Sequence, residues 1–154
     1  MSIFYIKEKG NEPHRNCLAE INKWLEDGAV KVTLSRKGLT RSQQQNKVLH
    51  MWIADIHQQT FEPLHEIGGR CKLQYFVPVL LASESDKAGR FQDIWQVVEA
   101  NTTYEKQVEI LGLSDIASTS LLSSKEFSQA LTTMRVSEQG KHWLRDPALR
   151  GLSI

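Results

Sequence analysis

The spacing of hydrophobic residues changes twice within the first 35 residues, and each change predicts an element boundary. Residues 2–7 (SIFYIK) and 30–35 (VKVTLS) are short runs containing β-branched or aromatic residues, and the second run alternates with a period of two, as strands do. Between them, hydrophobic residues recur every three or four positions, which predicts an amphipathic helix from about Pro13 to Asp27-Gly28. Its apolar stripe consists of Cys17, Leu18, Ile21, Trp24 and Leu25. The order strand, helix, strand favours pairing of the two strands.

A second amphipathic helix is expected after the break at residues 36–38. Ser42 and Gln45 have the spacing of a capping box, a device that stabilises a helix start by roughly 1 kcal/mol. One face of this helix is apolar, and burying each of its large side chains contributes about 1.5–3 kcal/mol. The residues of this face are Leu49, Trp52, Ile53 and Ile56.

The middle of the chain alternates between apolar segments and predicted breaks. Residues 61–69 contain Pro63 and Gly68-Gly69 and are expected to form a loop. Residues 71–82 form a dense apolar run that fits either a helix or a strand, and Pro78 would kink or end it if it is helical. After a polar linker at residues 84–89, the helical spacing returns over residues 91–111 and breaks near residues 101–102.

The last third predicts one further helix and a tail. Residues 115–124 are rich in Ser and Thr and favour a segment with a short strand. Ser123 and Glu126 then form a second capping box, which starts a helix that reaches Met134. The whole chain is therefore expected to be one α+β domain over residues 1–154, with a small N-terminal sheet and several packed helices. The tail after about residue 146 is expected to be mobile or to dock on a partner.

Composition places the chain among ordinary globular proteins. It has 154 residues, of which 40% are hydrophobic and 24% charged, and its formal net charge is +1. The sequence shows neither a signal peptide nor an apolar run long enough to span a membrane, which predicts a cytoplasmic protein. The isolated Cys17 and Cys71 are expected to be reduced thiols in that compartment.

Positive charge is concentrated in the stretch that joins the second strand to the second helix. Five Lys or Arg residues and no Asp or Glu occur from residue 28 to residue 54, although the net charge of the chain is only +1. A basic loop and helix start favour a polyanion, because free backbone N–H groups and the helix dipole add to the side-chain charge. Residues 91–134 are acidic by contrast and are not expected to meet a phosphate backbone. Solubility alone is the competing interpretation of the basic stretch.

Candidate chemistry outside this stretch is sparse. The sequence has no nucleotide-binding glycine motif, no nucleophile elbow and no CxxC pair. A metal site formed by Asp55, His57, His65 and Cys71 is one candidate, although these spacings match no zinc pattern. Trp24, Trp52 and Trp95 are expected in the core. Trp143 lies beside cations, as do the base-stacking aromatics of single-strand binding proteins, and a core position is its alternative.

Two blocks of the sequence resemble the NinB family, the phage lambda Orf-type recombination proteins. The first block is Val32-Thr33, then Arg41-Ser42, Gln45-Asn46-Lys47 and Leu49, and it extends through Asp55. The second is Ser118-Thr119-Ser120, then Glu126-Phe127 and later Gly140, Lys141 and Trp143. The family often has an aromatic residue where this chain has His50. If the family's aromatic ring stacks on bases, the imidazole of His50 takes its place in this chain, or the stacking contact is made by Trp52 instead.

The resemblance implies an α+β homodimer that binds single-stranded DNA and needs no cofactor. Such proteins act as recombination mediators: they work with the host single-strand-binding protein and help to load a strand-exchange protein. For a phage or prophage protein, this implies the host bacterial cytoplasm. The expected DNA-binding residues, from the resemblance, the charge pattern and the aromatic context together, are Arg36, Lys37, Arg41, Gln45, Asn46, Lys47, His50 and Trp143.

Two other functions fit the same basic stretch. A structure-selective, Mg²⁺-dependent endonuclease would need clustered carboxylates, with Asp55 or Asp93 as candidates, but the acidic residues are spread along the chain. A protein-interaction module would use the basic stretch to bind an acidic partner and would have no affinity for DNA.

Overall fold

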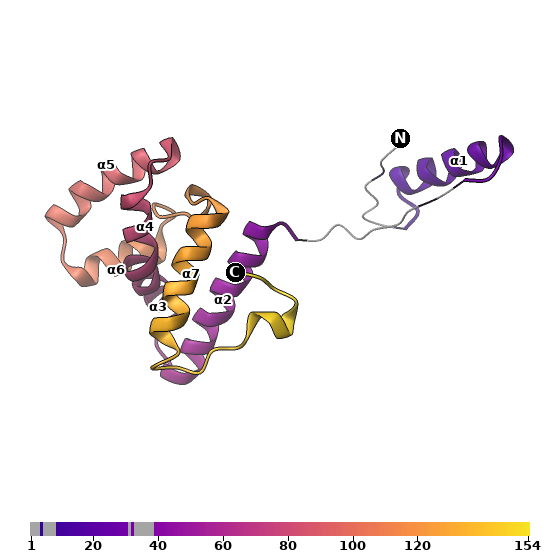
Figure 1. The fold of residues 1–154 in the computed structure, drawn as a ribbon. Helices are drawn as coiled ribbons and strands as arrows, with labels where there is room; N and C mark the ends of the chain where they lie inside the picture. Colours follow the sequence, from indigo (N-terminus) through magenta and orange to yellow (C-terminus); the bar gives the residue numbers. More distant parts are fainter. Residues whose placement is uncertain (1–3, 5–8, 31, 33–38) are drawn as a thin grey trace. The chain divides into compact units, whose positions relative to one another are not determined.

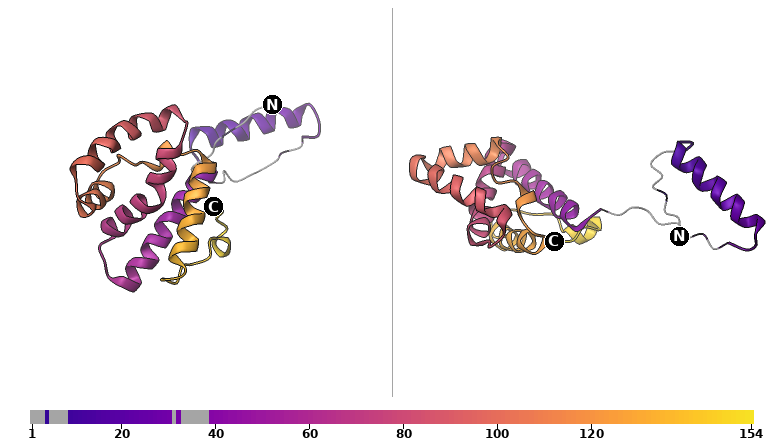
Figure 2. Two further views of the ribbon diagram at one scale, coloured as in Figure 1. Left: turned by 60° about the vertical axis from the view of Figure 1, so that its left-hand side comes forward. Right: turned by 90° about the horizontal axis from the view of Figure 1, so that it is seen from above.

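The computed structural model describes residues 4, 9–30, 32 and 39–154. It divides the chain into two compact units, Met1–Gly38 and Leu39–Ile154. Figure 1 shows the ribbon of each unit, and Figure 2 gives two further views.

The first unit contains the predicted N-terminal helix, α1 (Glu12–Glu26). The Asn11 side chain accepts a hydrogen bond from the backbone N–H of His14 at 3.0 Å, and Pro13 lies in the first turn, where no N–H is needed. Gly28 follows the helix with a φ of 141°, a conformation that favours glycine. No residue of α1 is buried, and Trp24, which was expected in the core, is exposed.

The second unit is a bundle of helices. None of the described helices is long and apolar enough to cross a membrane. In chain order its elements are α2 (Arg41–Thr60), α3 (Leu64–Cys71), the π-helical turn η1 (Lys72–Phe76), α4 (Val77–Ala82), α5 (Asp86–Asn101), α6 (Tyr104–Leu113), the 3₁₀ turn η2 (Thr119–Leu121), α7 (Ser124–Glu138) and the 3₁₀ turn η3 (Pro147–Arg150).

Aromatic side chains fill the core of this bundle. Phe76 of η1 packs edge-on against Phe127 of α7, with ring centroids 5.4 Å apart, while Phe91 and Trp95 of α5 stack at 5.7 Å. Trp52 of α2 is fully buried, as expected. Burial of these large rings removes apolar surface from water and stabilises the bundle together with the buried aliphatic side chains.

The expected α+β class is wrong. All regular elements among the described residues are helical, and the core is complete without a sheet. The expected strands at residues 2–7 and 30–35 lie almost entirely outside the described residues. The expected short strand at residues 115–124 is replaced by η2, because the Ser118 hydroxyl accepts the backbone N–H of Ser120 and holds a tight turn.

Residues 61–82 depart most from the prediction. The expected loop at residues 61–69 is limited to three residues, because α3 begins at Leu64 and includes Gly68 and Gly69. The helix then continues through η1 into α4. Pro78 lacks the N–H that would bond to the preceding turn, and directly before it the Val77 N–H bonds to the carbonyl of Lys72, five residues back. The wider π-helical turn therefore lets the helical segment from α3 to α4 include a proline without being interrupted.

The boundaries of the later helices follow local capping. The predicted polar linker is short, because α5 already begins at Asp86 behind the Ser85 cap, and the predicted break near residue 101 separates α5 from α6. The second capping box is confirmed: the Ser123 N–H donates to Glu126 Oε2 at 2.8 Å, and the Glu126 N–H donates to Ser123 Oγ at 3.2 Å. These contacts fix the start of α7.

Helices α3 and α6 approach so closely that only glycine fits where they cross. A Cβ atom on Gly69 would lie 2.0 Å from the carbonyl oxygen of Val108, and one on Gly112 would lie 2.1 Å from the carbonyl oxygen of His65. The neighbouring Gly68 has room, since its Cβ would lie 3.8 Å from Ile53 Cδ1. Gly69 thus serves helix packing rather than a turn, and both glycines lie within α3.

Gly69→Ala should lower the free energy of unfolding by about 2–4 kcal/mol, because α3 and α6 must separate to admit a methyl group. Gly68→Ala is the matched control in the same turn, and it should be neutral or stabilise the protein by up to about 1 kcal/mol through helix propensity. Urea unfolding of the two variants measures the difference. Equal stabilities would contradict the close crossing.

Candidate nucleic-acid interface

The start of α2 is fixed two residues before the expected position. Thr40 is the cap: its hydroxyl accepts the Gln43 N–H at 3.3 Å, while Gln43 Oε1 accepts the Thr40 N–H at 2.9 Å. The expected capping box of Ser42 and Gln45 is therefore wrong, and both residues lie inside the helix. Because Thr40 has the same hydroxyl chemistry as Ser42 and glutamine follows both at the same spacing, the sequence supports either start.

The buried face of α2 is anchored as predicted. Leu49, Trp52, Ile53 and Ile56 are all buried, and Val48 adds to the same face. The indole Nε1–H of Trp52 donates to the carbonyl of Arg145 at 2.9 Å, so the buried ring also has a polar partner. Helix α2 is thus held rigidly while its other side meets solvent.

Gln45 and Asn46 connect α2 to the first residue of α7 and to η2. Gln45 is completely buried, and its Nε2 donates to the carbonyl of Ser124 at 2.8 Å, while its Oε1 has no partner among the described residues. Asn46 is half-buried, and its Oδ1 accepts from the Thr119 hydroxyl at 3.0 Å. Both amides were expected to contact DNA. Gln45 is buried and has no accessible surface, and the Oδ1 atom of Asn46 already accepts a hydrogen bond from Thr119.

The carboxylate of α2 is buried and neutralised by a cation. Asp55 is 2% exposed, and its Oδ1 lies 2.6 Å from Arg145 Nε. Its Oδ2 accepts the backbone N–H of Arg145 at 2.9 Å. These partners compensate the buried charge of Asp55. Removing them would leave an uncompensated charge in the interior.

With Asp55 turned inward, the exposed face of α2 carries no carboxylate of its own. Asp55 is the one acidic residue of the helix. The exposed positions of α2 are cations, amides and one hydroxyl: Arg41, Ser42, Gln43, Lys47, His50, Gln58 and Gln59. Arg36 and Lys37, the other predicted cations, lie outside the described residues. The helix therefore presents positive and hydrogen-bonding groups without an opposing charge.

Trp143 lies at the other end of α2, on the segment that follows α7. Its indole is 69% exposed. Its backbone is held by one side chain of α2: the Trp143 N–H donates to Gln59 Oε1 at 2.9 Å, and Gln59 Nε2 donates to the Trp143 carbonyl at 2.8 Å. Gln59 was not among the predicted site residues, because a surface glutamine has no distinctive sequence signal.

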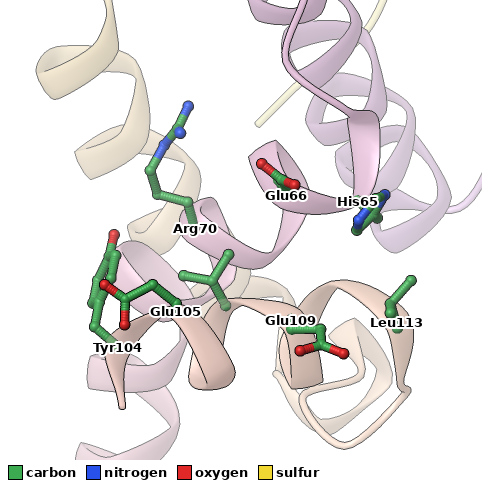
Figure 3. A pocket seen from close by; sticks show the side chains of 8 residues that line it. His65, Glu66, Arg70, Tyr104, Glu105, Glu109 and Leu113 are labelled. Atoms are coloured by element: carbon green, nitrogen blue, oxygen red, sulfur yellow. The ribbon is translucent and has the colours of Figure 1, made fainter.

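Acidic side chains gather on a different part of the bundle, the groove between α3 and α6. This groove has a volume of about 490 Å³. Figure 3 shows Glu66 of α3 facing it together with Glu105 and Glu109 of α6, and Tyr104 and Leu113 at either end. Arg70 also lines the groove but is paired with Glu62, and this pairing lowers the pKa of the Glu62 carboxyl. Phosphate groups are therefore disfavoured in this groove.

The candidate metal ligands are not brought together. Within the described part of the chain, no three His, Cys, Asp or Glu side chains are arranged to hold a metal ion. Asp55 is paired with Arg145, and His57 Nδ1 bonds to the carbonyl of Glu62. Burial raises the pKa of the Cys71 thiol to about 12, which disfavours the thiolate that a metal would require.

Asp55→Ala should destabilise the protein by about 2–4 kcal/mol, because the Arg145 guanidinium and backbone N–H would lose their acceptor. Asp93→Ala is the control: Asp93 is exposed on α5, so its loss should change stability by less than about 0.5 kcal/mol. Denaturant unfolding at pH 7 gives both values. A destabilisation as small as that of Asp93→Ala would contradict a structural role for the pair.

No protein-family model, curated protein or solved structure matches the chain. The likeness to the NinB family therefore rests on the quoted residues alone. On α2, Asn46 of the first block bonds to Thr119 of the second, and Gln45 bonds to the nearby Ser124.

Proposed function

We propose that the exposed face of α2 binds single-stranded DNA and that the protein does so as a phage or prophage recombination mediator. The observation that supports binding best is the inward position of Asp55. Because Arg145 neutralises this carboxylate inside the protein, Arg41, Lys47 and His50 face solvent with no acidic neighbour on their own helix. Such a surface suits a phosphate backbone, where cations supply affinity and amides supply hydrogen bonds.

The N-terminal end of α2 adds to the attraction of the surface for phosphate groups. The first backbone N–H groups of a helix have no intrahelical acceptor, and the helix dipole places partial positive charge at this end. Arg41 is the first residue of α2, so its guanidinium lies where that field is strongest. A strand that follows the helix from Arg41 meets Lys47 and His50 within about 14 Å of helix length.

The mediator role comes from the likeness to the NinB family. Under this proposal the protein is a homodimer in the bacterial cytoplasm that engages DNA coated by the host single-strand-binding protein and helps a strand-exchange recombinase to load. No cofactor is required, because the task is binding and positioning rather than bond cleavage. Two α2 surfaces in a dimer would raise the affinity for one strand through effective concentration.

Binding is favoured over cleavage by the position of the carboxylates. An endonuclease of the two-metal kind needs acidic side chains a few ångströms apart at the DNA surface. Asp55, the acid on the same helix as Arg41 and Lys47, is buried and paired with Arg145, and Asp93 lies on α5.

Fluorescence anisotropy of a labelled 40-nucleotide strand tests the proposal, with the matching duplex as comparison, several salt concentrations, and Mg²⁺ first absent and then present. We expect tighter, salt-sensitive binding to the single strand and an intact oligonucleotide. Cleavage on addition of Mg²⁺ would overturn the mediator role in favour of an endonuclease. Absence of binding at low salt would leave a protein-interaction module.

Arg41→Ala and Lys47→Ala should each weaken single-strand binding and reduce the slope of log K against log salt by about 0.7, the value for one lost phosphate contact. Lys106→Ala is the matched control. Lys106 has a half-exposed side chain but lies on α6, where it pairs with Glu109 at 2.9 Å. Unchanged slopes for both α2 variants, or an equal loss for Lys106→Ala, would refute this surface. Circular dichroism of each variant checks that the fold is retained.

A further inference from the structure

Both polar atoms of the Gln59 side-chain amide bond to the backbone of Trp143. Its Oε1 accepts the Trp143 N–H at 2.9 Å, and its Nε2 donates to the Trp143 carbonyl at 2.8 Å. The same Nε2 also donates to the carbonyl of Asp55 at 2.8 Å, which ties the glutamine to its own helix. Arg145 follows Trp143 by two residues, and its backbone N–H and guanidinium both donate to the Asp55 carboxylate. The chain on both sides of the Trp143 side chain is therefore fixed to α2.

The side chain of Trp143, unlike its backbone, is not held in place, because it is largely exposed. It is 69% exposed, whereas Trp52 and Trp95 of the same unit are at most 1% exposed. Single exposed hydrophobic residues are common on protein surfaces, so exposure alone indicates nothing. What distinguishes Trp143 is that its backbone is fixed while its side chain is exposed, which lowers the backbone part of the conformational cost when a flat ligand binds.

The charges around Trp143 suit a polyanionic strand. Lys141, two residues before it, is exposed to solvent, whereas the Arg145 guanidinium, two residues after it, is already paired with Asp55. The nearest preceding acid in the sequence, Glu138, is 5% exposed, and its Oε1 accepts the Tyr75 hydroxyl at 2.6 Å. The following acid, Asp146, lies 4.0 Å from Arg135. Cations beside an exposed aromatic ring are the combination that single-strand binding requires, because the ring stacks on a base and the cations neutralise phosphates.

We propose that Trp143 is a stacking platform for an unpaired base and that Gln59 is the residue that positions it. This inference rests on the proposed DNA binding by α2 and gives that surface its preference for single strands. Bases in a duplex are stacked on each other and offer no free face, while every unpaired base offers one. Gln59 lies 12 positions after Lys47 on the same helix, or about 18 Å, so one short strand reaches both.

The test compares two oligonucleotides of 20 nucleotides, one of thymidines and one of abasic units with the same phosphates. The wild-type protein should bind the thymidine strand about tenfold or more tightly, the effect of one stacked base. Trp143→Ala should lose this preference while its affinity for the abasic strand and its salt dependence stay unchanged. Trp143→Phe should retain part of the preference, because a smaller ring still stacks.

Gln59→Ala should reduce the preference as Trp143→Ala does, although the indole is still present. Gln59→Glu keeps the acceptor for the Trp143 N–H and loses the donor to its carbonyl, so it should retain an intermediate preference. Gln58→Ala is the matched control, since Gln58 is an exposed glutamine on the same turn. It should behave as wild type. Thermal unfolding of each variant separates lost positioning from lost folding.

Each contrary result has a distinct meaning. A preference that survives in Trp143→Ala would overturn the stacking platform while leaving DNA binding by α2 intact. A preference lost in Trp143→Ala but kept in both Gln59 variants would overturn the role of Gln59. If the wild-type protein bound neither strand at low salt, both this inference and the proposed function would fail.

Discussion

The ion pair between Asp55 and Arg145 is the contact on which the proposed surface depends. It lies between residues 90 positions apart in sequence and fixes the segment after α7 against the middle of α2. A carboxylate on the exposed side of this helix would oppose every cation beside it. Inside the protein, the same carboxylate holds Arg145 in place, and the carbonyl of Arg145 in turn satisfies the buried indole of Trp52. One interaction therefore removes a negative charge from the surface and organises the chain behind it.

Local patterns predicted the helices well where capping and hydrophobic spacing agreed. The sequence identified α1, the apolar face of α2, the break between α5 and α6, and the capping box of α7 from residues near to each other in the chain. It failed where a residue served a distant segment. Gly68 and Gly69 indicate a turn when considered alone, but Gly69 is needed because the backbone of Val108 passes beside it. The apolar run at residues 71–82 had no predicted form, because a proline in a helix is tolerated only with a local change such as the π-helical turn.

The candidate site was predictable in its charges but not in its side-chain orientation. Clustering of Lys and Arg around the start of α2 is visible in sequence, and the structure places Arg41, Lys47 and His50 in solvent. Gln45 and Asn46 have the same polarity as exposed amides, yet both face Thr119 and Ser124, more than 70 residues later. The role of Gln59 is invisible in sequence for the same reason. Only the fold reveals which of several similar amides bonds to another segment.

The separation of charge within the bundle has a consequence for how a ligand approaches. Glutamates line the groove between α3 and α6, while α2 presents cations, and α3 packs against both α2 and α6. Such an arrangement places negative and positive side chains on different helices of a chain whose net charge is only +1. Under the proposed function, an approaching nucleic acid would be repelled by the groove and attracted by α2, which would turn α2 toward it before the surfaces touch. Orientation at a distance reduces the number of unproductive encounters without the strong nonspecific attraction of a polycation.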